Sequence, residues 1–165
     1  MTEESPAQKI VEPAGGQALR FVDSYLAFLL AQASSRISRE FHREVEAVGL
    51  SVTEWRVLAS LEGSDGESIG VLSQLTLTKQ PTLSKVVQRM EADGIVDRTH
   101  VRTDRRQTVV QITPKGHRLM DALRERAIEH QNRVLEPFGR ENAEMLISML
   151  KALLALHPVV VPVED

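Results

Sequence analysis

The chain of 165 residues is long enough for one domain, or for one domain with extensions. Its formal net charge of −3 excludes a protein that binds polyanions over its whole surface. Because cysteine is absent, disulfides, thiolate metal sites, cysteine nucleophiles and thiol redox sensors are excluded as well.

Residues 1–17 contain several Glu, Pro and Gly residues and predict a mobile N-terminal tail. This segment lacks the basic and apolar regions of a signal peptide. No run in the sequence approaches the ~18 apolar residues of a membrane-spanning helix. We therefore expect a cytoplasmic protein with no membrane partner.

Apolar residues at helical spacing predict a first helix over residues 18–48, ended by Gly49. Ser51 and, three residues later, Glu54 form a capping box, which predicts the start of a second helix that carries Trp55. The apolar stripe of the first helix is long and wide, which indicates that it is covered on more than one side.

Two shorter helices are predicted next, the third capped by Ser68 and the fourth by Thr78, with a break at residues 76–77. Pro81 falls in the first turn of the fourth helix, where its missing N–H costs little. Four apolar residues at i, i+3, i+4 and i+7 define the inward face of the fourth helix: Leu83, Val86, Val87 and Met90.

Two segments rich in β-branched residues, 95–102 and 107–113, flank a polar tip and predict a two-stranded hairpin. Thr113 and Pro114 then begin a long helix that extends to about Asn132, and a last helix covers about residues 141–156.

This order of elements predicts a mainly α-helical fold with a small β wing. Residues 51–113 form a winged helix-turn-helix region, because a hairpin directly follows two short helices joined by a tight turn. Residues 18–48 and 115–156 supply a separate helical region, and residues 157–165 form a C-terminal tail.

Positive charge is concentrated in residues 78–106, which contain seven Lys or Arg and four Asp or Glu. That segment is therefore +3, which leaves −6 for the rest of a chain whose total is −3. A basic segment on an acidic body is typical of a surface that faces DNA.

The outward face of the fourth helix carries hydroxyl, amide and basic groups that suit base edges and phosphates in the major groove. The tip of the hairpin carries arginines that suit the minor groove, with an aspartate that could orient one of them. A solvated helix face and an ordinary charged turn are the alternative interpretations. The candidate DNA-binding residues are Thr78, Lys79, Gln80, Thr82, Ser84, Lys85, Arg89, Arg102, Asp104, Arg105 and Arg106.

The sequence contains no catalytic constellation, so we expect neither an enzyme nor a bound cofactor. His42 and Glu46 are spaced as half of a metal site, but no second pair converges with them, and a metal-responsive regulator is kept only as an alternative. A winged-helix module that binds another protein is a second alternative. It would explain the fold but not the basic face.

The segments "GLSVTEWRVLASL", "LTKQPTLSKVVQRMEADGIVDR" and "DRRQTVVQITPKGHRLM" resemble the MarR (multiple antibiotic resistance regulator) family of winged-helix transcription factors. The resemblance extends from about Leu19 to Leu156. One departure is Thr76, because family members often have glycine in that turn. The most specific part is the wing pattern Gly94–Ile95–Val96, Arg98, Asp104–Arg105–Arg106, Ile112–Thr113 and Gly116.

The resemblance implies a homodimer in which the helices of residues 18–48 and 115–156 interlock. The wide apolar faces of these helices independently favour a partner. A dimer with two-fold symmetry would bind double-stranded DNA at a pseudo-palindromic operator, with half-sites about one helical turn, ~34 Å, apart.

The resemblance further implies a repressor that responds to a small effector, often an anionic aromatic compound or a related thioester. Arginine could hold the carboxylate of such a compound and an aromatic side chain its ring. A solvated arginine face and a core tryptophan are the competing interpretations. The candidate effector residues are Arg36, Arg39, Phe41, His42 and Trp55.

Overall fold

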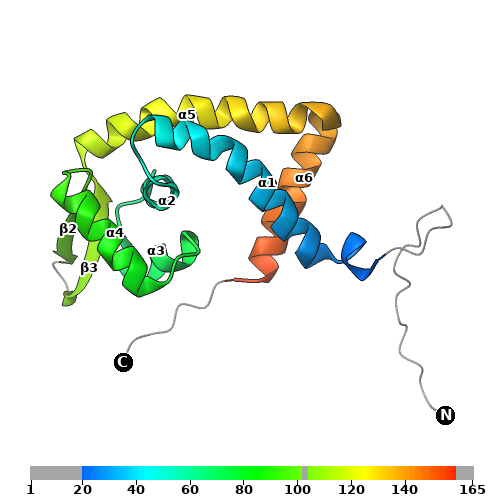
Figure 1. Ribbon diagram of the computed structural model, residues 1–165. Helices are drawn as coiled ribbons and strands as arrows, with labels where there is room; N and C mark the ends of the chain where they lie inside the picture. The colour runs from blue at the N-terminus through cyan, green and yellow to red at the C-terminus, as the bar shows by residue number, and fades with distance from the viewer. Residues whose placement is uncertain (1–19, 102–103, 159–165) are drawn as a thin grey trace, which may run out of the picture. The chain divides into compact units, whose positions relative to one another are not determined.

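The computed structural model describes residues 20–101 and 104–158, and within these ranges the side chains of residues 100, 101 and 104–107 are outside the described set. The chain divides into two compact units, one ending at Arg36 and the other starting at Ile37. Helix α1, Leu26–Ala47, contributes to both units (Figure 1).

The first unit begins with a short 3₁₀ helix, η1, Phe21–Asp23. The prediction of a continuous helix from residue 18 is therefore wrong at its start, since α1 begins only at Leu26. The reason is local. The Asp23 carboxylate accepts the backbone N–H of Arg20 at 3.2 Å and pairs with its guanidinium at 3.0 Å, which closes a separate turn.

Helix α2, Val52–Leu61, and helix α3, Ile69–Leu75, begin where their caps predict. Ser51 accepts the N–H of Glu54, and Ser68 accepts the N–H of Val71. Gly49 has φ +80°, the left-handed conformation expected of a residue that ends α1.

Helix α4, Gln80–Ala92, begins two residues later than its predicted cap. Thr78 does not cap it, because its hydroxyl donates instead to the carbonyl of Thr76 at 3.2 Å. Lys79 occupies the N-cap position without a side-chain hydrogen bond to the helix. Pro81 lies in the first turn, as predicted.

The turn between α3 and α4 places its left-handed residue at Leu77, with φ +54°, while Thr76 has φ −85°. The N–H of Leu77 bonds to the carbonyl of Gln74, and the N–H of Thr78 bonds to that of Ser73, which is the Schellman pattern. Thr76 therefore does not occupy a glycine-requiring position. The strained residue is an exposed leucine.

The sheet has three strands in the order β1-β3-β2 rather than the predicted two. The expected hairpin forms from β2, Val96–Val101, and β3, Asp104–Ile112. Strand β1, Glu67–Ser68, adds to the far edge of β3. A strand of two residues has no periodicity, so the sequence pattern alone does not reveal it.

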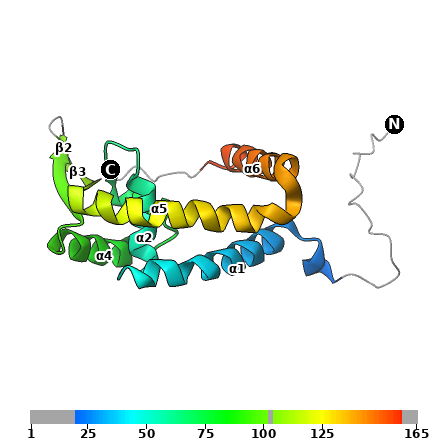
Figure 2. The ribbon, with the colours of Figure 1, turned by 90° about the horizontal axis from the view of Figure 1, so that it is seen from above.

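Helix α5, Pro114–Leu135, begins at the predicted cap Thr113 and extends three residues beyond the predicted end. A 3₁₀ turn, η2, Glu136–Phe138, then redirects the chain into α6, Gly139–Leu156 (Figure 2). No helix in the described ranges is both long and apolar enough to cross a bilayer.

The core lies where α2, α3, α4, α5 and the sheet meet, with a contribution from the end of α1. Helix α4 contributes three fully buried side chains, so one face of it is fixed against the rest of the unit. By contrast, none of the α6 residues, all of which the structure describes, is buried. The fully buried apolar side chains are Val45, Val57, Leu58, Leu72, Leu83, Val87, Met90, Val96, Val110 and Leu123.

We expect Leu77→Gly to leave the free energy of unfolding unchanged or to raise it by up to about 1 kcal/mol. The Leu77 side chain is 86% exposed, so little burial is lost, and glycine removes the left-handed strain. Thr76→Gly is the matched control. It should lower stability by about 1–2 kcal/mol, because Thr76 is buried and donates to Leu72. Urea denaturation at fixed protein concentration measures both, and the reverse order would refute the assignment.

We expect Gly116→Ala to destabilise the protein by about 2 kcal/mol or more, because overpacked sites force the backbone to move. A methyl group there would lie 2.2 Å from the carbonyl oxygen of Ile95 and 2.7 Å from the side chain of Ile112. Gly70→Ala is the control, since its nearest neighbour is 3.7 Å away. A Gly116→Ala protein as stable as the control would contradict the close packing of α5 on β2.

Candidate nucleic-acid interface

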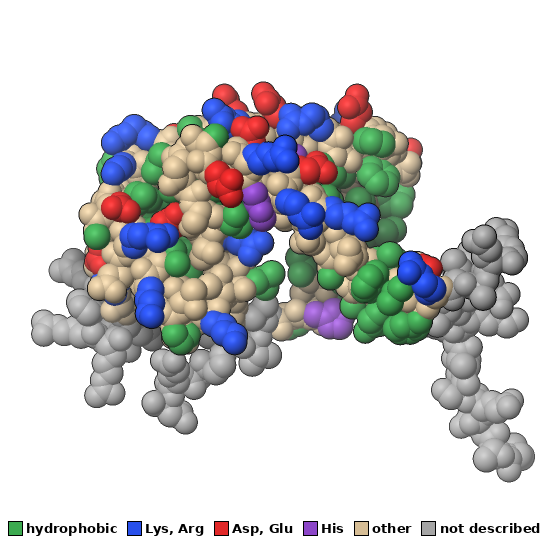
Figure 3. All heavy atoms as spheres, in the orientation of Figure 1, with side chains coloured by type: hydrophobic (Ala, Val, Ile, Leu, Met, Phe, Trp, Pro, Cys, Tyr) green, Lys and Arg blue, Asp and Glu red, His purple; other side chains and the backbone are tan. Residues whose placement is uncertain are grey.

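The outward face of α4 carries the polar residues that the sequence singles out. Thr78 is half-buried in the preceding turn, whereas the residues listed at the end of this paragraph are exposed. In Figure 3 the lower part of α4 shows Lys and Arg side chains among neutral ones. The exposed candidates on or beside α4 are Lys79, Gln80, Thr82, Ser84, Lys85 and Arg89.

The start of α4 is open to an acceptor from outside the chain. Lys79 makes no side-chain cap bond, and the described residues supply no other side chain as a cap in its place. The N-terminus of a helix carries partial positive charge, and uncapped N–H groups there favour a phosphate oxygen. Lys79 adds a full positive charge at the same point.

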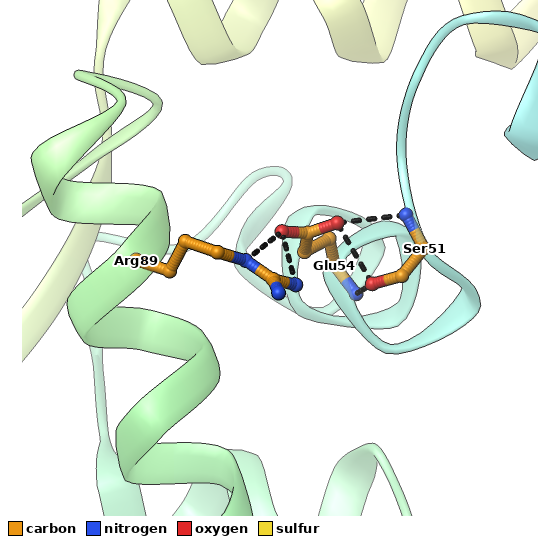
Figure 4. A network of polar contacts seen from close by, with 3 residues as sticks. All are labelled: Ser51, Glu54 and Arg89. Atoms are coloured by element: carbon orange, nitrogen blue, oxygen red, sulfur yellow. Dashed lines mark hydrogen bonds and ion pairs between the residues drawn. The ribbon is translucent and has the colours of Figure 1, made fainter.

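Arg89 lies on the last turns of α4 and bonds within the chain (Figure 4). Its Nε and Nη2 donate to Oε1 of Glu54 at 3.1 and 2.8 Å. The other oxygen, Oε2 of Glu54, accepts from the backbone N–H and the hydroxyl of Ser51, both at 2.7 Å. The sequence indicates the Ser51–Glu54 cap but not Arg89, which lies 35 residues further along the chain.

The environment of Glu54 lowers the pKa of its carboxyl group. Burial acts in the opposite direction and raises the pKa, but the hydrogen bonds from Ser51 and the ion pair with Arg89 outweigh it. The ionised carboxylate therefore stabilises the fold above its ordinary pKa of about 4.3. That contribution is lost as the pH falls through the lowered pKa.

A shallow hollow of about 330 Å³ lies on the outer side of α4. Its lining combines two cationic side chains and one hydroxyl with apolar atoms. The lining residues are Pro81, Thr82, Lys85, Val86 and Arg89. Three of the sequence candidates, Thr82, Lys85 and Arg89, are therefore brought together at one place.

The wing has a regular base, where strand β2 pairs in register with β3 as far as His100 and shifts beyond it. Arg98 is held by Glu91 of α4 at 2.7 Å, so the wing is tied to the helix. Arg102 lies outside the described residues. Residues 104–106 belong to β3, but their side chains are outside the described set, so the pairing of Asp104 with a neighbouring arginine stays a prediction.

Two of the effector candidates lie together. The rings of Phe41 and Trp55 have centroids 5.3 Å apart, and the imidazole of His130 lies 5.5 Å from Phe41. Phe41 is buried and Trp55 is half-buried against the core. His130 also lies 3.5 Å from a carboxylate oxygen of Glu40. Sequence periodicity did not place His130 in this cluster.

The other effector candidates are not gathered there by any contact among the described residues. Arg36 and Arg39 are exposed on α1, and His42 is half-buried. Within the described ranges, no group of three or more His, Asp or Glu side chains is arranged to hold a metal ion.

Comparison with known proteins identifies the family. A sequence profile described as "MarR family" matches residues 48–107. The chain is 29% identical over 126 residues to the HTH-type transcriptional repressor IacR of Pseudomonas putida, covering 76% of this chain and 75% of that protein. The structure of the transcriptional repressor CouR bound to a 23-mer DNA duplex is 25% identical, with a TM-score of 0.68 over 83% of this chain and 99% of that one.

A crystal structure of a MarR family transcriptional regulator from Silicibacter pomeroyi DSS-3 is 34% identical, with a TM-score of 0.72. The match covers 84% of this chain and 99% of that one. At this identity, and over nearly the whole of the relative, the likeness is one of sequence as well as fold. The chain belongs to the MarR family of DNA-binding transcriptional regulators.

Proposed function

We propose that the protein is a ligand-responsive repressor that binds a pseudo-palindromic DNA operator as a homodimer in the cytoplasm. The observation that carries the proposal is the outward face of α4, where an uncapped, proline-containing start and exposed hydroxyl, amide and basic side chains face away from a packed core. Helices of this kind fit the major groove.

The geometry supports a division of roles along α4. Residues at its start, such as Lys79, Gln80 and Thr82, would reach base edges and the nearest phosphate. The wing would place arginines 102, 105 and 106 over the adjacent minor groove. CouR, which shares the fold, is bound to a DNA duplex in its solved structure, and this supports the same partner for this chain.

The proposal of a homodimer rests on apolar surface that the chain leaves open. On α6, Met149 is 60% exposed and Leu154 is 71% exposed. Figure 3 shows a second group of hydrophobic side chains over the N-terminal end of α1. Exposed patches of this kind mark association surfaces, and two-fold dimers are by far the commonest assembly that covers them.

We infer that an anionic aromatic effector, or a related thioester, lowers the affinity for DNA. The cluster of Phe41, Trp55 and His130 supports the inference, because aromatic rings flanking a buried imidazole suit a ring that carries a negative charge. Arg36, Arg39 and His42 on α1 are further candidates for the carboxylate. An effector that binds the free form better than the DNA-bound form must shift the equilibrium toward release.

We expect Lys85→Ala and Arg105→Ala each to weaken operator binding without disturbing the dimer. Each variant should lower the slope of log K against log salt by about 0.9 per phosphate lost, counted twice per dimer. Arg140→Ala is the control, because Arg140 is 91% exposed and pairs only with Glu144 in the described chain. Fluorescence anisotropy across a salt series measures the slopes, and unchanged slopes for both test variants would refute the interface.

We expect Met149→Asp and Leu154→Asp each to convert the dimer to monomer at micromolar concentration. Both side chains are largely exposed in a single chain, so the charge costs the protomer little but would be buried without a partner in the dimer. Lys151→Asp on the same helix is the control for introducing an acid, because Lys151 is exposed. Sedimentation velocity distinguishes the two states, and intact dimers for both variants would exclude α6 from the interface.

A further inference from the structure

Arg89 is only partly used by its bond to Glu54. A guanidinium carries five N–H donors, and the pair of bonds from Nε and Nη2 to Oε1 takes two of them. The side chain is still 58% exposed, whereas that of Glu54 is 8% exposed. The donors left over, including both on Nη1, are therefore on the solvent side of the pair.

Glu54 is held independently of Arg89. Its second oxygen accepts two bonds from Ser51, both at 2.7 Å, and these bonds close the cap of α2. Because the carboxylate cannot turn, the guanidinium bonded to it is also fixed in orientation. The conformational entropy that a long arginine loses on binding a ligand is then already lost in the free protein.

The fixed guanidinium forms one wall of the hollow on α4, together with Lys85 and Thr82. Arg89 and Glu54 together are formally neutral, so Arg89 supplies directed donors there rather than net charge. Lys85 is exposed and supplies the charge. Directed N–H donors, a hydroxyl and one ammonium around a shallow hollow match the oxygens of a phosphate diester.

We propose that Glu54 is a positioning residue for DNA binding, which presents Arg89 beside Lys85 and Thr82 to one backbone phosphate in each half-site. Arg89 then sets the register of α4 on the duplex and does not read a base. This inference rests on the proposed function, since it requires DNA to be the partner of this face.

The test uses an operator in which single phosphates are replaced by neutral methylphosphonates. For the wild-type protein, one replacement per half-site should weaken binding by on the order of 10-fold. In the double variant Glu54→Gln/Arg89→Met, which leaves no unpaired buried charge, the same replacement should have little effect. Other phosphates, including any contacted by the wing, should keep their full penalty.

Glu54→Gln alone separates positioning from folding. Glutamine can still close the cap of α2, so the melting temperature should change little. Arg89 would gain a net charge but lose its fixed orientation. Binding to non-operator DNA should therefore be equal or tighter, while the ratio of operator to non-operator affinity falls several-fold. A role in folding alone would lower the melting temperature and leave this ratio unchanged.

Two results would overturn the inference. The first is a methylphosphonate profile identical in the wild type and the double variant. The second is a base-pair substitution whose penalty disappears in that variant, which would make Arg89 a base reader. In either case the proposed function stands if Lys85→Ala and Arg105→Ala still weaken binding. If those two also bind normally, the proposed function fails with it.

Discussion

A buried carboxylate joins the supporting part of the winged domain to its exposed face. Glu54 closes the start of α2 through Ser51 and at the same time bonds to Arg89 on α4. Removing a charge from water is costly unless it is fully hydrogen-bonded, and here both oxygens have partners. The orientation of α4 is therefore set by a polar contact as well as by packing, and polar contacts are directional where packing is not.

The remainder of α4 depends on the separation of its two faces. Leu83, Val87 and Met90 are fully buried, so the helix cannot rotate about its axis without exposing them. The same constraint fixes which residues point outward. Arg56 of α2 reaches the carbonyl of Thr76 at 3.3 Å, and Arg98 of the wing reaches Glu91. Contacts at both ends of α4 thus hold its outward face in one position relative to α2 and the sheet.

Features encoded by neighbouring residues were predictable from the sequence. Ser51, Ser68 and Thr113 begin helices as their patterns indicate, since a cap needs only a side chain and the next turn of backbone. Thr78 has the same residue type, yet it bonds backward to Thr76 because the turn before α4 consumes its hydroxyl. Strand β1 and the partner of Arg89 depend on residues far apart in the sequence, so no local pattern announces them. The candidate site was therefore predictable as a face, but not in its bonding.

Helix α6 buries nothing within its own chain, and this links the behaviour of the protein to its abundance. A surface covered only by a second copy is covered according to mass action, so its protection weakens as the protein is diluted. Newly made chains at low copy number would expose that helix to proteases and to other sticky surfaces. The homodimer proposed here would thus be longer-lived in cells that hold more of it, and the dose of regulator would influence its own turnover.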